Sequence, residues 1–174
     1  AFLLPFHASY LSLVVRAELK EGETLLVISG ASGLGTAGIQ VGKALGARVI
    51  ATVSSEEKAE LCRTLGADLV INHAQEDFAE AVLQATDDVG ADVIFDLAGG
   101  DFVGKSWTCV ARGGRYLPIG FVDDDTNGMT GRPLRMAGIG NFSIVGVLTA
   151  WVDEVDPGLR RFGFNPYTRA EGDR

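Results

Sequence analysis

Short apolar runs alternate with segments of helical periodicity along most of the chain. Residues 24–29 (TLLVIS) form a continuous apolar run, which is typical of a strand buried on both faces. Gly46 then closes a segment of helical spacing, as glycine commonly does. The alternation predicts strands at residues 24–29, 48–53, 68–71, 92–95, 116–121 and 143–148. It predicts helices at residues 35–45, from Ser54 or Ser55 to 65, 76–86 and 102–110, after an amphipathic N-terminal helix ending near Arg16.

This order of elements predicts an α/β fold with a doubly wound, mostly parallel sheet, a Rossmann fold in three layers, αβα. Strand–helix–strand crossovers are right-handed, and they place helices on both faces of such a sheet. The composition, 47% apolar and 22% charged, is that of a globular protein. No repeat or second domain is visible, so we expect residues 1–174 to form a single dinucleotide-binding domain.

The charge and the apolar segments exclude several partners. A net charge of −8 argues against binding to nucleic acid or to an anionic membrane. The apolar opening is interrupted by His7 and Ser9, has no basic leader and is too short for a membrane span. Cys62 and Cys109 have no metal-ligand spacing, and we expect both to be reduced, buried thiols within helices. Reduced thiols in turn suggest a cytoplasmic protein.

A glycine-rich turn carries the strongest chemical signal. The sequence SGASGLGTAG directly follows the first predicted strand, and Gly33, Gly35 and Gly38 match the pattern G-x-G-x-x-G. In order, such glycines permit a tight turn, let a pyrophosphate approach the backbone and let the helix pack on the strand. The alternative is a turn needed only for chain reversal. The residues expected to bind the dinucleotide here are Ala31, Ser32, Gly33, Leu34 and Gly35.

The end of the second predicted strand favours NADP(H) over NAD(H). An acidic residue there would bind the ribose 2′-hydroxyl of NAD and repel a 2′-phosphate, but residues 53–55 read Val-Ser-Ser. Lys58 follows within reach of a phosphate held beside Ser54, a combination that suits the phosphorylated cofactor. The alternative for Lys58 is a solvated helical residue paired with a glutamate at 56 or 57. His73 either flanks the adenosine or its phosphate, or is a surface-loop histidine without a role.

Four stretches resemble the cofactor-binding domain of the quinone oxidoreductase (zeta-crystallin-like) branch of the medium-chain dehydrogenase/reductase family. They are KEGETLLVISGASG, GTAGIQVGKALGARVIATVSSEEKAELCRTLGADLVIN, DVIFDLAGG and RGGRYLPIGF. The resemblance implies hydride transfer with NADPH, usually to quinones, enones or other activated alkenes. By position, Ser54 and Lys58 would meet the 2′-phosphate, and His73 stands where these proteins often place a tyrosine. Gly99, together with Gly120 and Phe121, would approach the ribose and nicotinamide.

The resemblance also defines what we do not expect to find. Zinc is generally not required in this branch, so no zinc is expected, and no catalytic residue is nominated. Asp96 is interpreted as a loop-ordering or capping residue. The family's GroES-like catalytic domain, which forms much of the substrate cleft, is absent from these 174 residues. The glycine turn is also one residue shorter than the family's usual GASGGVGT.

Three functions remain open from the sequence. The first is the cofactor-binding half of an NADPH-dependent quinone or enone reductase or alcohol dehydrogenase-like enzyme. The second is a stand-alone NADP(H)-binding module without turnover. The third is a methyltransferase using S-adenosylmethionine, which usually needs an acidic residue where Ser54 and Ser55 stand. We also expect a homodimer through an apolar edge strand at residues 143–148.

Overall fold

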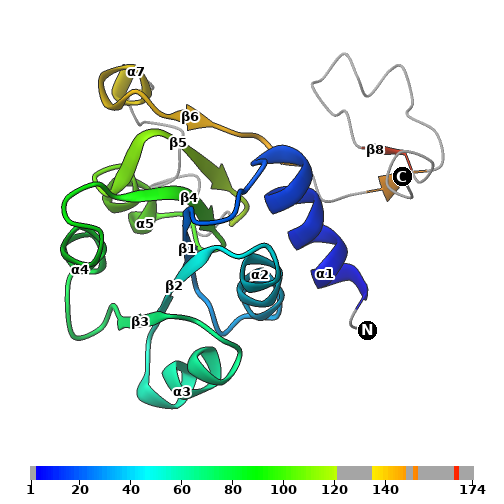
Figure 1. Ribbon diagram of the computed structural model, residues 1–174, viewed down its shortest axis with the longest axis horizontal. Helices are drawn as coiled ribbons and strands as arrows, with labels where there is room; N and C mark the ends of the chain where they lie inside the picture. The colour runs from blue at the N-terminus through cyan, green and yellow to red at the C-terminus, as the bar shows by residue number, and fades with distance from the viewer. Residues whose placement is uncertain (1–2, 121–134, 148–150, 153–166, 169–174) are drawn as a thin grey trace.

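The computed structural model describes residues 3–120, 135–147, 151–152 and 167–168 (Figure 1). An N-terminal α-helix continues directly into a π-helix that ends at Arg16, as the sequence predicts. The helices are α1 Leu3–Tyr10, η1 Leu11–Arg16, α2 Gly33–Ala44, α3 Glu56–Thr64, α4 Phe78–Ala85, α5 Asp101–Ser106 and α7 Arg135–Gly140. The strands are β1 Thr24–Ile28, β2 Arg48–Val53, β3 Leu69–Asn72, β4 Ala91–Asp96, β5 Val110–Pro118, β6 Ser143–Ile144, β7 Trp151–Val152 and β8 Tyr167–Thr168. Among the described helices, none is long and apolar enough to cross a membrane.

The main sheet has six strands in the order β3-β2-β1-β4-β5-β6, and every neighbouring pair is parallel. The chain winds outward from β1 to β3, then returns to the other side of β1 and winds outward through β4, β5 and β6. The predicted doubly wound α/β fold is therefore confirmed. In such sheets the strand order reverses at one point, here between β1 and β4, and ligands bind outside the carboxyl ends of the strands there.

Two separate apolar cores cover the two faces of this sheet. On one face, Leu25 and Val27 of β1 pack with residues of β2 and with Ile39 of α2 and Cys62 of α3. On the other face, Ile28 of β1 packs with residues of α4 and α5. Figure 1 shows α2 and α4 on opposite sides of the sheet. Because consecutive β1 side chains enter different cores, all five residues of this strand are buried, which explains its unbroken apolar run.

The second half of the chain departs from the predicted element boundaries. Helix α5 ends at Ser106, four residues before the predicted end, and Cys109 lies beyond it, so the placement of Cys109 in a helix was wrong. The turn after α5 is closed by bonds to helix carbonyls, including that from the Thr108 hydroxyl to the Lys105 carbonyl (2.7 Å). Strand β5 then begins at Val110, six residues earlier than predicted.

An irregularity inside β5 explains why its start was misplaced. Ala91 of β4 pairs with Val110, whereas Val93 pairs with Arg115, so β5 contains extra residues between these two points. Gly113 lies in this irregular part with a φ of 81°, a conformation that favours glycine. Gly113 therefore marks an irregularity within the strand and not its beginning.

The last strand of the main sheet is shorter than predicted. Only residues Ser143–Ile144 of the expected 143–148 form strand β6, residues 145–147 have no regular structure, and Leu148 lies outside the described residues. The sequence also gave no signal for α7. Helix formation there places Phe142, just after α7, in the core against Trp107 at a ring-centroid distance of 5.7 Å.

Candidate functional site

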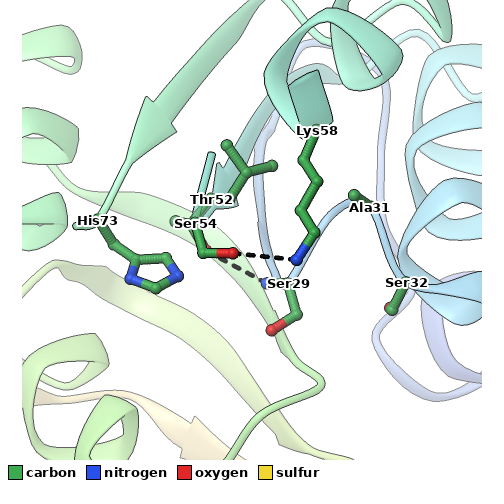
Figure 2. A pocket seen from close by; sticks show the side chains of 8 residues that line it. Ser29, Ala31, Ser32, Thr52, Ser54, Lys58 and His73 are labelled. Atoms are coloured by element: carbon green, nitrogen blue, oxygen red, sulfur yellow. Dashed lines mark hydrogen bonds between the residues drawn. The ribbon is translucent and has the colours of Figure 1, made fainter. Parts of the chain in front are cut away.

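A hollow of about 180 Å³ opens at the carboxyl ends of β1, β2 and β3 (Figure 2). Five residues that line it were predicted to bind the cofactor, namely Ala31, Ser32, Ser54, Lys58 and His73. Three further lining residues were missed: Ser29, Thr52 and Val53. Thr52 could have been suspected, because it is the one polar residue among the buried residues of this strand. The structure thus brings together residues that come from three separate connections.

The glycine-rich turn is held by a cap and by bonds to β2. Ser32 is the N-cap of α2, and its hydroxyl accepts a hydrogen bond from the Gly35 amide (3.0 Å). Ser29 adopts a φ of 60°, and its amide donates to the Thr52 hydroxyl (3.2 Å). The Gly30 amide donates to the Thr52 carbonyl (2.9 Å). The turn is therefore fixed on one side of the hollow, beside the first turn of α2, where helices present unpaired amides and a positive dipole end.

The first two glycines of the fingerprint have surroundings that differ from those expected, whereas the third agrees. A Cβ on Gly33 would meet nothing within 4 Å, whereas a Cβ on Gly35 would lie 2.5 Å from the Ser29 carbonyl oxygen. A Cβ on Gly38 would lie 3.0 Å from the Phe95 ring, in agreement with the expected helix–strand packing. Glycine is thus required at position 35 because the backbone of the same turn leaves no room for a side chain. Gly33 is the position whose missing side chain leaves open space.

Lys58 points back across the start of α3 toward Ser54 (Figure 2). Its Nζ donates to the Ser54 hydroxyl at 3.0 Å, while Ser55, not Ser54, caps the helix by accepting from the Lys58 amide. Within the described part of the chain, Lys58 has no carboxylate within 4.0 Å, and Glu56 pairs instead with Arg63 at 2.6 Å. The predicted alternative, a Lys58 paired with a neighbouring glutamate, is not formed.

His73 lies on another side of the same hollow, directly after β3. Its amide donates to the carbonyl of Val53 (3.0 Å), which ties the loop to the end of β2. Its ring meets Phe102 of α5 edge-on, with ring centroids 5.0 Å apart and an interplanar angle of 88°. Burial lowers the pKa of the imidazole; its own backbone raises it to a lesser degree, and the charges of Lys58 and Lys105 lower it further.

Asp96, at the end of β4, orders the neighbouring loops. It is fully buried, and one carboxylate oxygen accepts from the Ala98 and Gly99 amides, both at 2.9 Å. The other oxygen accepts from the Tyr116 hydroxyl at 2.6 Å. The Asp96 carbonyl also accepts from the Gly120 amide at 3.0 Å. The predicted loop-ordering role is confirmed, because this one residue joins the ends of β4 and β5.

The remaining predicted site residues lie beside the hollow or outside the described residues. Gly99 has a φ of 73° in the turn after β4. Gly120 passes so close to that turn that a Cβ would lie 2.3 Å from the Leu97 carbonyl carbon. Gly33, Leu34 and Gly35 form the first turn of α2, and Phe121 lies outside the described residues. These backbone segments surround the carboxyl edge of the sheet without lining the hollow itself.

The described residues do not fit a zinc site. They contain no group of three or more His, Cys, Asp or Glu side chains that could hold a metal ion. Cys62 and Cys109 are buried in different cores on opposite faces of the sheet. Burial raises the pKa of both thiols, that of Cys109 to about 12 with a further contribution from Asp77, so neither readily becomes the thiolate that binds zinc.

Comparison with known proteins places the chain among dehydrogenases. The profile of a family described as zinc-binding dehydrogenase matches residues 33–162. A quinone oxidoreductase-like protein 2 homolog from Nematostella vectensis is 30% identical over 162 residues, which are 92% of this chain and 43% of that protein. The hybrid PKS-NRPS synthetase pynA of Aspergillus niger is 41% identical over 122 residues, 68% of this chain but 3% of that protein.

A solved structure described as a putative enoyl reductase domain of polyketide synthase has the same fold. It superposes with a TM-score of 0.73 at 27% identity, covering 85% of this chain and 79% of that one. The chain therefore spans a small part of its first curated relatives and under half of the quinone oxidoreductase-like protein, but most of this isolated domain. The predicted resemblance to dehydrogenases of the quinone oxidoreductase type is confirmed.

Proposed function

Because the chain belongs to the zinc-binding dehydrogenase family, we propose that it is the NADP(H)-binding domain of an oxidoreductase that transfers a hydride to an activated alkene or quinone. The observation that carries the preference for the phosphorylated cofactor is the hollow beside Ser54, Lys58 and His73. No carboxylate lines this hollow, and one lysine there has no acidic partner among the described residues. A 2′-phosphate would supply the missing negative charge.

The pyrophosphate of the cofactor would lie over the first turn of α2. Its negative charge suits the helix dipole, and the open space at Gly33 lets an oxygen approach the backbone. The nicotinamide, when bound, supplies the hydride that the reaction transfers. The chain's own part is to hold the cofactor. Asp96 contributes by fixing the turn at Gly99 and Gly120, over which the nicotinamide end would pass.

The test is titration calorimetry of the 174-residue chain with NADPH and NADH. Lys58→Ala should weaken the binding of NADPH by about tenfold or more, since a hydrogen bond to a charged group contributes about 1.5–3 kcal/mol. It should leave the affinity for NADH almost unchanged. Lys58→Arg keeps the charge and should retain most of the preference. Lys20→Ala, which removes an exposed lysine outside the hollow, is the matched control. Equal affinities of the unaltered chain for NADPH and NADH would refute the proposed preference.

The first seven curated relatives, taken with the solved structure described as a putative enoyl reductase domain of polyketide synthase, favour an enoyl thioester as the substrate class. Six of the seven have polyketide synthase or PKS in their names, the seventh is a squalestatin hexaketide synthase, and each is 32–41% identical to this chain. The quinone oxidoreductase-like relative supports a quinone instead. NADPH oxidation should be followed with a short enoyl thioester and with a benzoquinone. Preference for either assigns the substrate class.

The homodimer remains a proposal that rests on the edge of the sheet. Strand β6 is the edge strand, as predicted, and an edge strand presents unpaired backbone groups to a second chain. Just beyond it, the Arg16 guanidinium donates to the Gly146 carbonyl (3.0 Å) and covers part of the following segment. A molar mass in solution that stays monomeric across a wide range of protein concentrations would exclude this dimer.

A further inference from the structure

Resting on the proposed binding of NADP(H), we infer that His73 makes the preference for the phosphorylated cofactor depend on pH. Its imidazole ring takes up a proton from solvent when the 2′-phosphate enters the hollow. The protonated ring then donates a hydrogen bond to a phosphate oxygen. His73 is thus a specificity-determining residue, and it acts only on the cofactor that carries this phosphate.

The position of His73 supports this role. Its side chain lines the hollow together with Ser54 and Lys58, and Figure 2 shows the ring and the Lys58 side chain on opposite sides of Ser54. The ring is held by edge-on contact with Phe102, and its backbone by the bond to Val53. A phosphate placed between the lysine and the ring would therefore meet a donor that the fold already holds in place.

Burial and the neighbouring charges disfavour protonation of the ring when no phosphate is present. Lys58 faces it from α3, and Lys105 faces it from α5, where Asp101 also lines the adjoining hollow beside the ring. Lys105 is neutralised in part by Asp77, the N-cap of α4, at 2.7 Å. Partial burial, and then the charges of these two lysines, disfavour a positive charge on the ring and so lower the pKa of the imidazole.

Phosphate binding reverses this balance. A 2′-phosphate carries about −1.5 to −2 charges at neutral pH, enough to neutralise Lys58 and to favour the imidazolium ion. The pKa of His73 is then higher in the complex than in the free protein. By linkage, NADPH binds more tightly as pH falls through the bound pKa, and the gain is complete below the free pKa. The total gain is about tenfold for each unit by which binding raises the pKa.

Calorimetry at pH 8.5, 7.5 and 6.5 tests the inference while the phosphate stays largely dianionic. Titrations of NADPH and NADH in two buffers of different ionisation enthalpy also give the number of protons taken up. The variant is His73→Gln, which keeps a hydrogen-bond donor but cannot titrate. His7→Gln is the matched control, since His7 is the other histidine of the chain and lies on α1, away from the hollow. Circular dichroism checks that each variant is folded.

We expect the unaltered chain and His7→Gln to bind NADPH more tightly as pH falls, with net proton uptake. His73→Gln should show a flatter profile and less uptake, and NADH should show neither effect in any variant. The inference fails alone if NADPH is preferred in a Lys58-dependent way but the pH profile and proton uptake are the same in His73→Gln. If NADPH is not preferred over NADH at any pH, both the proposed cofactor preference and the inference about His73 fail.

Discussion

Two glycines of the same motif should respond to alanine in opposite ways. At Gly35, a Cβ would lie 2.5 Å from the Ser29 carbonyl oxygen and 2.6 Å from that of Gly30, so backbone must move by about an ångström. Such overpacking costs about 1–3 kcal/mol, or about 2–12 °C in Tm for a domain of this size. At Gly33, the first residue of α2, a Cβ meets nothing within 4 Å and φ is not positive, so alanine should stabilise the fold by about 0.4–1 kcal/mol. Gly33→Ala should therefore fold at least as stably as the unaltered chain.

The affinity for the cofactor should not follow the order of stability of the two variants. If the pyrophosphate approaches the backbone at Gly33, the added methyl group occupies its place, and NADPH affinity should fall by about tenfold or more. Thermal unfolding measures the first effect and titration calorimetry below the melting range measures the second. A Gly33→Ala protein that binds NADPH normally would refute the assignment of that open space to the pyrophosphate. A Gly35→Ala protein with an unchanged Tm would refute the claim that the turn leaves no room for a Cβ at this position.

Three other predictions test the interior and its charges. Tyr116→Phe leaves a buried oxygen of Asp96 without its hydroxyl donor and should lower the free energy of unfolding in urea by about 1–3 kcal/mol, with an unchanged m value. Burial raises the pKa of Glu23, but the hydrogen bonds and charge of Arg115 outweigh it and hold that pKa below its ordinary value. The ion pair therefore stabilises the fold above about pH 4.5, and this contribution is lost as pH falls through the lowered pKa; Glu23→Gln should show a shallower loss of stability between pH 5 and 3, and an equal loss would contradict it. Finally, because burial raises the pKa of Cys109 to about 12 and that of the other thiol as well, a disulfide reagent at pH 8 should titrate no thiol rapidly in the native chain and both in urea.

Strand positions in the first half of the fold could be predicted closely because the physical signals there are local. Strand β2 was predicted at its observed bounds, Arg48–Val53, and β1 within one residue. Each is a buried parallel strand, which needs an unbroken apolar run whatever the rest of the chain does. The boundaries of β5 could not be predicted in the same way. Its early residues belong to an irregular pairing with β4, and only the tertiary register shows that Gly113 lies inside a strand.

The candidate site was predicted in its side chains but not in its glycines. Ser54 and Lys58 directly follow β2 in the sequence, so the strand end fixes their place, and the absence of an acidic residue there can be seen without a structure. The roles of Gly33 and Gly35 depend on which carbonyls the turn passes, and this depends on the bonds from Ser29 and Gly30 to Thr52. Those bonds join residues more than twenty positions apart, which no local pattern reports.

The shorter glycine turn keeps its links to the start of α2 and to β2. The Ser32 cap closes the helix start, and Thr52 receives both the Ser29 and Gly30 amides, so the turn needs no additional residue to reach β2. What a missing residue can change is the set of amides that faces a pyrophosphate. The proposed selectivity for a 2′-phosphate rests on a different part of the fold, Lys58 and His73, which follow β2 and β3. Affinity for the pyrophosphate and preference for the 2′-phosphate should therefore vary independently. Gly33→Ala should weaken the binding of NADPH and NADH alike, whereas Lys58→Ala should weaken the binding of NADPH alone. The same pattern of affinities in both variants would mean that the two regions act as one.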